Sequence, residues 1–259
     1  MPTLPAIFLG HGNPMNAIAR NATTDAWASI GASIPKPRSI LAVSAHWYGP
    51  GTRVTAMEAP PTIHDFGGFP QALFDVSYPA PGDPALARRV AELLAPVAVD
   101  LDIMDWGLDH GTWSVLCHLY KEADVPVVQL SIDAMRPPQF HYDMGRALGP
   151  LRDEGVLVIG SGNVVHNLRA YAWGRQGAAP LDWAVRFDTT VRKLALAVND
   201  AALVAYDRLG RDAANAIPTP EHYLPLLYVL GTRRPGDAVT FPVAGIDGGS
   251  VSMLAVRLG

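Results

Sequence analysis

The stretch SILAVSAHW, from Ser39 to Trp47, shows most clearly how this chain folds. It is an apolar run that does not alternate with polar residues, and a histidine follows it directly. Strands that are covered on both faces of a sheet have this character. Further short runs rich in Val, Ile and Leu occur at Ala6–Leu9, Val125–Ile132, Val156–Ile159, Ala238–Val243 and Val251–Val256. We therefore predict a buried sheet built from these segments.

Longer amphipathic segments lie between these runs and predict helices. The segment from Asp83 to Pro96 begins with Asp followed by Pro, a common start of a helix. The other predicted helices are Thr112–Glu122, His141–Asp153, Leu181–Val198 and Pro220–Leu230. Strands that alternate with helices predict an α/β fold, with a central mixed, largely parallel β-sheet flanked by helices. We expect residues 1–259 to form a single domain.

The longest irregular stretch runs from Ala59 to Pro81 and is rich in aromatic residues, glycine and proline. We expect a long ordered loop here, because long ordered loops in compact domains are often functional.

Composition excludes several classes of protein. The 259 residues carry a formal net charge of -4 and include no run of Lys or Arg, which disfavours a nucleic-acid partner. Cys117 is the only cysteine, so neither a disulfide within the chain nor a multi-cysteine metal site is possible. The first residues lack the features of a signal peptide, and no apolar stretch approaches a membrane span. We expect a cytoplasmic protein that does not act at a membrane.

The positions of the eight histidines suggest a metal site. His11, His46 and His166 each follow a predicted strand, beside glycines or other small residues. In open α/β sheets ligands bind beyond the carboxyl ends of the strands, so these three side chains can converge. Imidazole suits Zn, Fe, Cu and Ni, and its presence does not choose among them. His118 and His141 lie inside predicted helices, and we expect them to be structural.

Several short motifs occur in order along almost the whole chain. They are FLGHGNPM (8–15), SAHW (44–47), HDFGGFP (64–70), YPAPG (78–82), GLDHGTW (107–113), GSGN (160–163) followed by His166-Asn167, and PEHYLP (220–225). In this combination the chain closely resembles the DOPA 4,5-dioxygenase type of class III extradiol dioxygenases, which are relatives of the catalytic subunit of protocatechuate 4,5-dioxygenase.

The resemblance implies a specific set of site residues. His11, His46 and His222 would bind the metal, with His166 as a fourth ligand or an outer partner. His110 matches the acid–base histidine of the family. Better-known relatives use two histidines and one glutamate, and Glu221 beside His222 leaves a carboxylate ligand open.

The resemblance also implies the chemistry, which is extradiol cleavage of a DOPA-like catechol ring by O₂. We expect one divalent metal per chain: Fe(II) for activity, with Zn(II) possible in the purified or crystallised protein. Three facial protein ligands leave coordination positions open for a catecholate and O₂. A histidine titrates near neutrality, so His110 can act as both base and acid. His64, Phe69 and Tyr223 are the predicted substrate contacts, and we expect a monomer or weak homodimer.

Two other functions remain open at this stage. Three histidines and a water molecule would also form the site of a zinc-dependent hydrolase, with His110 as its base. A non-enzymatic binding protein can share the same scaffold, because a fold alone does not define a function.

Overall fold

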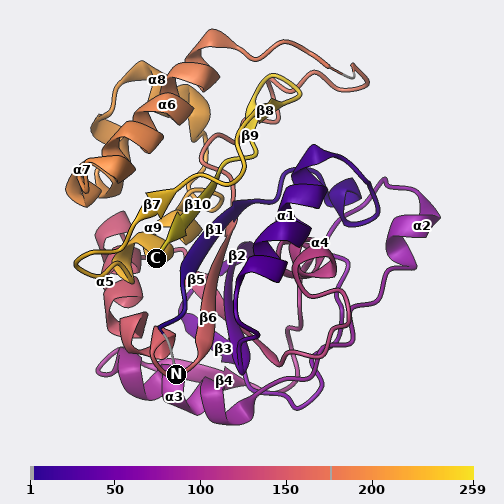
Figure 1. Cartoon of the computed structure of the whole chain (residues 1–259), viewed down its shortest axis with the longest axis vertical. Helices are drawn as coiled ribbons and strands as arrows, with labels where there is room; N and C mark the ends of the chain where they lie inside the picture. Colours follow the sequence, from indigo (N-terminus) through magenta and orange to yellow (C-terminus); the bar gives the residue numbers. More distant parts are fainter. Residues whose placement is uncertain (1–2, 176) are drawn as a thin grey trace.

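A mixed sheet of eight strands forms the centre of the computed structural model, which describes residues 3–175 and 177–259 (Figure 1). The strand order is β4-β3-β5-β2-β6-β1-β10-β7. The strands are β1 (Ala6–Gly10), β2 (Ser39–Gly49), β3 (Thr52–Thr55), β4 (Val99–Asp102), β5 (Val127–Asp133), β6 (Val156–Gly162), β7 (Val239–Thr240) and β10 (Ala255–Leu258). The four central strands β5, β2, β6 and β1 are parallel to one another. These features confirm the predicted mixed, largely parallel sheet in a single α/β domain.

Helices cover both faces of the sheet. The longer ones are α1 (Ala22–Ser33), α3 (Pro84–Leu94), α4 (His110–Leu119), α5 (Pro138–Leu148), α6 (Asp182–Leu196) and α9 (Leu224–Gly231). The short ones are α2 (Gln71–Phe74), α7 (Asp200–Val204), α8 (Arg211–Ala216) and the 3-10 helices η1 (Pro14–Ala17), η2 (Gly149–Arg152) and η3 (Tyr206–Arg208). Strands β8 (Ile246–Asp247) and β9 (Val251–Ser252) form a separate hairpin.

The residues of β2 show why its sequence does not alternate between apolar and polar. Ile40 and Ala42 belong to the core beneath α1 and α4, whereas Leu41 and Val43 belong to the core that includes residues of α3, α5, α6 and α9. Successive strand residues point to opposite faces, so a strand covered on both sides must be apolar throughout. This arrangement buries the strand whose end carries His46.

Several boundaries differ from those predicted. The run Val251–Val256 forms two strands, because β9 pairs with β8 whereas β10 pairs with β1. Helix α4 begins at His110, two residues before the predicted start at Thr112, because the carboxylate of Asp109 accepts a hydrogen bond from the Thr112 amide. The segment 59–81 is irregular apart from α2, as expected. Among the described residues, no helix combines the length and apolar character that a membrane span requires.

His141 in α5 is fully buried, and its Nδ1 lies 3.1 Å from the Tyr228 hydroxyl of α9. Burial lowers the pKa of His141 to about 4. The unfolded chain takes up a proton at this residue near pH 6.5, whereas the folded protein does so only near pH 4. Above about pH 6.5, His141 therefore does not change the free energy of unfolding with pH. Between about pH 6.5 and pH 4 it lowers the free energy of unfolding progressively as the pH falls.

We predict that His141→Gln reduces the acid sensitivity of the fold. Between pH 7 and pH 5 the wild type should lose about 2 kcal/mol more unfolding free energy than the variant, as urea denaturation at both pH values would measure. His118→Gln is the matched control, because His118 is only partly buried on another helix. Equal losses of unfolding free energy in wild type and His141→Gln would contradict the lowered pKa of His141.

Candidate metal centre and active site

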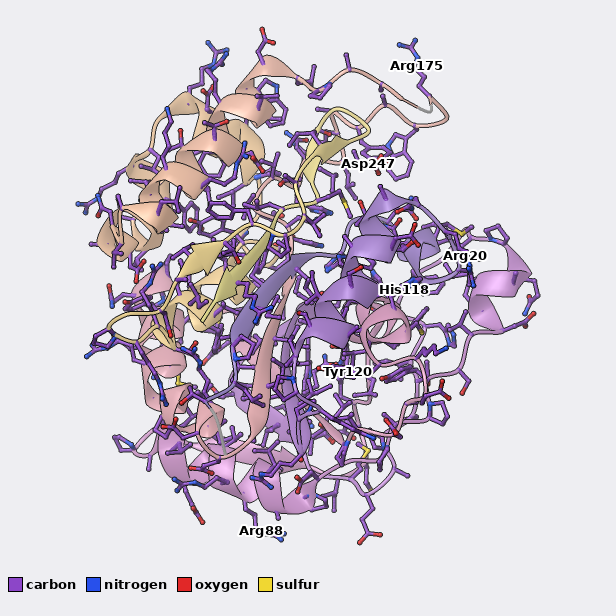
Figure 2. All side chains as sticks on the ribbon, in the orientation of Figure 1. Arg20, Arg88, His118, Tyr120, Arg175 and Asp247 are labelled. Atoms are coloured by element: carbon purple, nitrogen blue, oxygen red, sulfur yellow. The ribbon has the colours of Figure 1, made fainter. Side chains whose placement is uncertain are left out.

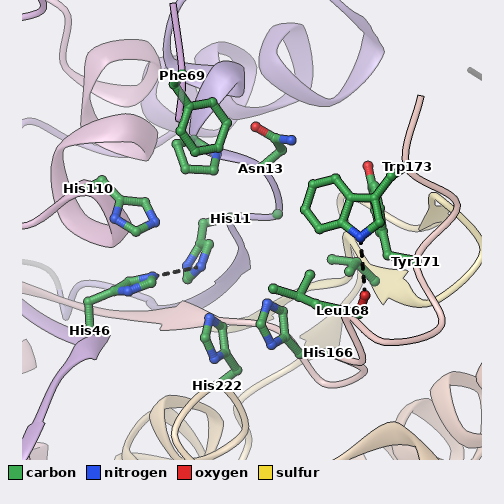
Figure 3. A pocket seen from close by; sticks show the side chains of 13 residues that line it. His11, Asn13, His46, Phe69, His110, His166, Leu168, Tyr171, Trp173 and His222 are labelled. Atoms are coloured by element: carbon green, nitrogen blue, oxygen red, sulfur yellow. Dashed lines mark hydrogen bonds between the residues drawn. The ribbon is translucent and has the colours of Figure 1, made fainter. Parts of the chain in front are cut away.

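Three histidines from distant parts of the chain meet at the carboxyl edge of the central strands. His11 directly follows β1, His46 lies near the end of β2, and His222 precedes α9 (Figure 3). The His222 loop rests on the end of β6, where the Asn163 amide donates to the His222 carbonyl at 2.8 Å. A Cβ at Gly162 would lie 2.2 Å from that same carbonyl oxygen, so this approach requires glycine.

The three imidazole rings form a nearly regular triangle. Their centroids lie 5.1 Å (His11–His46), 5.3 Å (His11–His222) and 5.2 Å (His46–His222) apart. The Nε2 atoms of His11 and His46 are 3.3 Å apart. Two imidazole nitrogens that share one metal at ordinary bond lengths and angles lie about 3.0–3.4 Å apart. The spacing therefore fits a common metal ion.

Each of these histidines has a polar partner at its other ring nitrogen. Ser161 donates its hydroxyl proton to the Gly111 carbonyl at 2.5 Å, so its oxygen can accept from His11 Nδ1 at 3.0 Å. The carboxylates of Asp65 and Glu221 lie 3.3 Å from His46 Nδ1 and 3.2 Å from His222 Nδ1. Partners of this kind fix the tautomer with the proton on Nδ1, which leaves the Nε2 lone pair free for a metal.

The histidine cluster is held in its neutral form. Burial, and then the neighbouring imidazoles, lower the pKa of His11 and of His222 well below the ordinary value. For His46 burial and His110 outweigh the nearby carboxylates and lower the pKa to about 3. Neutral imidazole is the form that binds metal, so the cluster presents ligands rather than positive charges at neutral pH.

His166 lies beside this triangle rather than within it. Its ring stacks on that of His222, with centroids 3.5 Å apart and planes 9° from parallel. Burial lowers the pKa of His166 to about 4. A nitrogen of its ring lies close to a carboxylate oxygen of Glu221 and a ring nitrogen of His222, whereas the His11–His46–His222 group does not include it. This position suits an outer partner of the site, and the Glu221 carboxylate already accepts from Thr219 at 2.7 Å.

His110 adjoins the triangle and is held by Asp65. The Asp65 carboxylate accepts from the His110 amide and lies against His110 Nδ1, both at 2.9 Å. Burial raises the pKa of Asp65, but the hydrogen bonds and charge of His110 outweigh it, so the net shift is downward. One oxygen, Oδ2, faces both His46 and His110. Sequence reasoning missed this residue, although Asp65 lies inside the HDFGGFP motif.

A buried polar group fixes the start of α4 and therefore the backbone of His110. Asp109 caps the helix and also accepts a hydrogen bond from the Gln129 side chain. Burial raises the pKa of Asp109 to about 6. The Gln129 carbonyl oxygen in turn accepts from the Thr112 hydroxyl at 2.8 Å. These contacts join β5 to the first turn of α4, where His110 lies.

A cavity of about 250 Å³ opens over the histidines (Figure 3). Its lining residues are His11, Gly12, Asn13, Pro14, His46, Phe69, His110, His166, Leu168, Tyr171, Trp173, His222 and Val251. Sequence reasoning missed Asn13, Leu168, Tyr171 and Trp173. Two signals pointed to them: Asn13 lies in the FLGHGNPM motif, and an aromatic stretch, YAW, follows His166-Asn167 within a few residues.

The three predicted substrate contacts differ in whether they line the cavity. Phe69 lines the cavity, as expected of a substrate contact. His64 does not: its Nε2 lies 3.0 Å from the Val76 carbonyl, and its ring packs on Phe66 and Trp113. Tyr223 is also wrongly predicted as a contact. It is fully buried in the core, where its hydroxyl donates to the Leu203 carbonyl, and it does not line the cavity.

The fold and the histidine cluster together define an α/β protein with a candidate non-haem metal centre, and the comparisons agree. Residues 2–240 match the family described as the catalytic LigB subunit of aromatic ring-opening dioxygenase. The chain is 54% identical to 4,5-DOPA dioxygenase extradiol of Escherichia coli K12, over 99% of this chain and 95% of that protein. It is 37% identical to the protein of the same name from Beta vulgaris, over 95% and 92%.

A solved structure agrees as well. The crystal structure of an uncharacterised protein from Escherichia coli K12 superposes with a TM-score of 0.86 at 47% identity, covering 99% of this chain and all of that one. The chain belongs to the LigB family of aromatic ring-opening dioxygenases. The resemblance seen in the motifs is thereby confirmed, and the dioxygenase is favoured over the zinc hydrolase and the non-enzymatic binding protein.

We predict that Gly111→Ala weakens metal binding, because the new Cβ would lie 2.3 Å from Ser44 Oγ and 2.8 Å from the His46 ring. Metal affinity, measured by competition with a chromophoric chelator, should fall roughly 10- to 100-fold, as when other ligand supports are disturbed. Gly49→Ala is the matched control, because a Cβ at Gly49 meets nothing within 4 Å. Thermal unfolding verifies that both variants are folded, and unchanged affinity in folded Gly111→Ala would refute the prediction.

Proposed function

We propose that this dioxygenase is an Fe(II)-dependent extradiol enzyme that cleaves the ring of a DOPA-like catechol with O₂. The observation that carries the proposal is the convergence of three neutral histidines, which line one cavity together with His110, whose Nδ1 faces Asp65. Both oxygen atoms of O₂ enter the ring-opened semialdehyde product, so the reaction needs no external reductant.

The proposed metal ligands are the Nε2 atoms of His11, His46 and His222, with His166 as an outer partner. When bound there, Fe(II) supplies adjacent open positions at which a catecholate and O₂ can meet. Zinc accepts the same nitrogen donors, so Zn(II) can replace iron in purified protein without supporting the redox chemistry. Ser161, Asp65 and Glu221 hold the ligand rings in place.

The proposed role of His110 is to move protons. Its Nδ1 faces Asp65, so its Nε2 remains available to accept a proton from a catechol hydroxyl in the cavity. The Asp65 carboxylate would stabilise the imidazolium that forms, and the same proton can then return during ring opening. Phe66 packs edge-on against His110, with centroids 5.4 Å apart, which limits the access of water from that side.

The substrate class is supported by the relatives that are named 4,5-DOPA dioxygenase extradiol. We further propose that residues 1–259 form one catalytic domain that acts in the cytoplasm as a monomer or weak homodimer. The proposed partners are the catechol and O₂, and we expect neither a nucleic acid nor a membrane to bind the protein.

We predict that protein loaded anaerobically with Fe(II) consumes O₂ and forms a yellow ring-opened product from a catechol. His46→Ala should lose most of its bound iron, because one of the converging ligands is removed. His110→Gln should retain iron but turn over about 100-fold more slowly or worse, because the proton acceptor is lost. Iron analysis, an oxygen electrode and absorbance measure these outcomes. Equal iron content in His46→Ala and wild type would contradict the ligand set.

Asp65→Asn should reduce kcat roughly 10- to 100-fold, because the amide cannot stabilise a charged His110 and orients His46 less well. We expect most of the iron to remain bound, since the three ligand side chains are intact. Asp75→Asn, an exposed aspartate of the same loop that contacts Gln71, is the matched control. Wild-type kcat in Asp65→Asn would exclude the proposed role.

A further inference from the structure

The cavity has two chemically different ends (Figure 3). One end is formed by the histidines, where the two ring hydroxyls of a catechol would bind. The remaining lining is mainly apolar or aromatic, and its outer part consists of Leu168, Tyr171 and Trp173. A substituent on the catechol ring must therefore face this outer part, which we call the rim.

The rim exposes apolar surface that is held in place. The side chains of Trp173 and Leu168 are 61% and 45% exposed. Trp173 Nε1 donates to the Leu168 carbonyl at 3.3 Å, and the Tyr171 ring lies 4.7 Å from the Trp173 ring. The Tyr171 hydroxyl donates to Asp247 at 2.7 Å. Large apolar side chains that are fixed and exposed beside a cavity are typical of a binding surface.

The described lining of the cavity contains no Lys, Arg, Asp or Glu. The carboxylates of Asp65 and Glu221 contact His110 and His222, and the exposed carboxylate of Asp247 accepts from the Tyr171 hydroxyl without itself lining the cavity. Of the cations on the rim segment, Arg169 is exposed and does not line the cavity, and Arg175 extends from the tip of the loop away from the body of the protein (Figure 2).

Because the described lining carries no charged side chain of these four types, binding of a charged substituent at the rim is unfavourable. A carboxylate group that enters the rim loses water without gaining a cationic partner among the lining residues, and such desolvation is unfavourable. An ammonium group gains no ionic partner from the lining either, since Asp247, the carboxylate beside the rim, is exposed to water and already accepts from Tyr171. An alkyl or aryl group that enters the rim instead removes its own surface and that of Trp173 from water, which is favourable. Binding at the rim should therefore discriminate by charge.

Resting on the proposed function, we propose that the preferred substrate is a catechol whose ring substituent is uncharged and apolar, alkyl or aryl. Leu168, Tyr171 and Trp173 are the specificity-determining residues that pack against it. The amino-acid group of DOPA would remain at the solvent side of the rim and add little to binding.

The test compares substrates of equal substituent length with the iron-loaded enzyme. The probes are 4-propylcatechol, 3-(3,4-dihydroxyphenyl)propanoate and DOPA, with unsubstituted catechol as reference. We expect kcat/KM for 4-propylcatechol to exceed that for DOPA and for the propanoate by about tenfold or more. Each methylene from catechol to 4-propylcatechol should raise kcat/KM by about two- to fourfold. A kcat/KM for DOPA equal to or above that for 4-propylcatechol would overturn the proposal.

Variants and a binding measurement test whether the preference for an apolar substituent arises at the rim. Trp173→Ala should lower the ratio of kcat/KM for 4-propylcatechol to that for catechol about fivefold or more, and Trp173→Phe should restore most of it. Leu196→Ala removes an exposed apolar side chain outside the cavity and should leave the ratio unchanged. Anaerobic calorimetry should show the same ranking in Kd. A ratio unaffected by Trp173→Ala would also overturn the proposal, whereas failure to open any catechol, the reference included, would instead refute the proposed function.

Discussion

The close approach of Nε2 lone pairs from His11 and His46 is the constraint on which this site depends. Two neutral imidazoles that direct lone pairs at each other across 3.3 Å repel one another unless a cation or a proton lies between them. Burial and the neighbouring rings disfavour protonation of either ring to its charged form, and the partners at Nδ1 favour the tautomer with its proton there rather than on Nε2. The fold keeps the approach through rigid supports: strand ends that carry the backbone, and Ser161, Asp65 and Glu221 at the outer ring nitrogens. A metal bound at the proposed site would relieve that repulsion.

Asp65 links the two halves of the site. Asp65 Oδ2 faces both His46 and His110. A change in charge on His110 therefore alters the electrostatic environment of His46, a proposed metal ligand, through this one oxygen. A carboxylate in this position can balance positive charge on either side without moving. The residue comes from the long loop 59–81, whereas His46 and His110 come from β2 and α4. The irregular loop is therefore part of the proposed catalytic machinery.

The parts of the fold that depend on local pattern could be predicted from the sequence. The central strands are continuous apolar runs, and the histidines that follow them meet because parallel strands end at one edge. Strands β3 and β4 were missed because each has only four residues and a mixed pattern. Asp65 was missed in favour of His64 because sequence order does not say which of two adjacent loop side chains faces inward. The same ambiguity placed Tyr223 at the cavity, although Tyr223 lies in the core and only its neighbour His222 lines the cavity.

The origins of the two ends of the cavity suggest why one chemistry can serve different substrates. The histidine end is built on β1, β2, α4 and the loop that rests on β6, so a change there disturbs the core. The rim comes from the segment after β6, whose exposed side chains make few core contacts. Substitution at Leu168 or Trp173 alters the surface offered to a substituent at little cost in folding free energy. Substrate preference can therefore change in this fold while the three converging imidazoles stay in place.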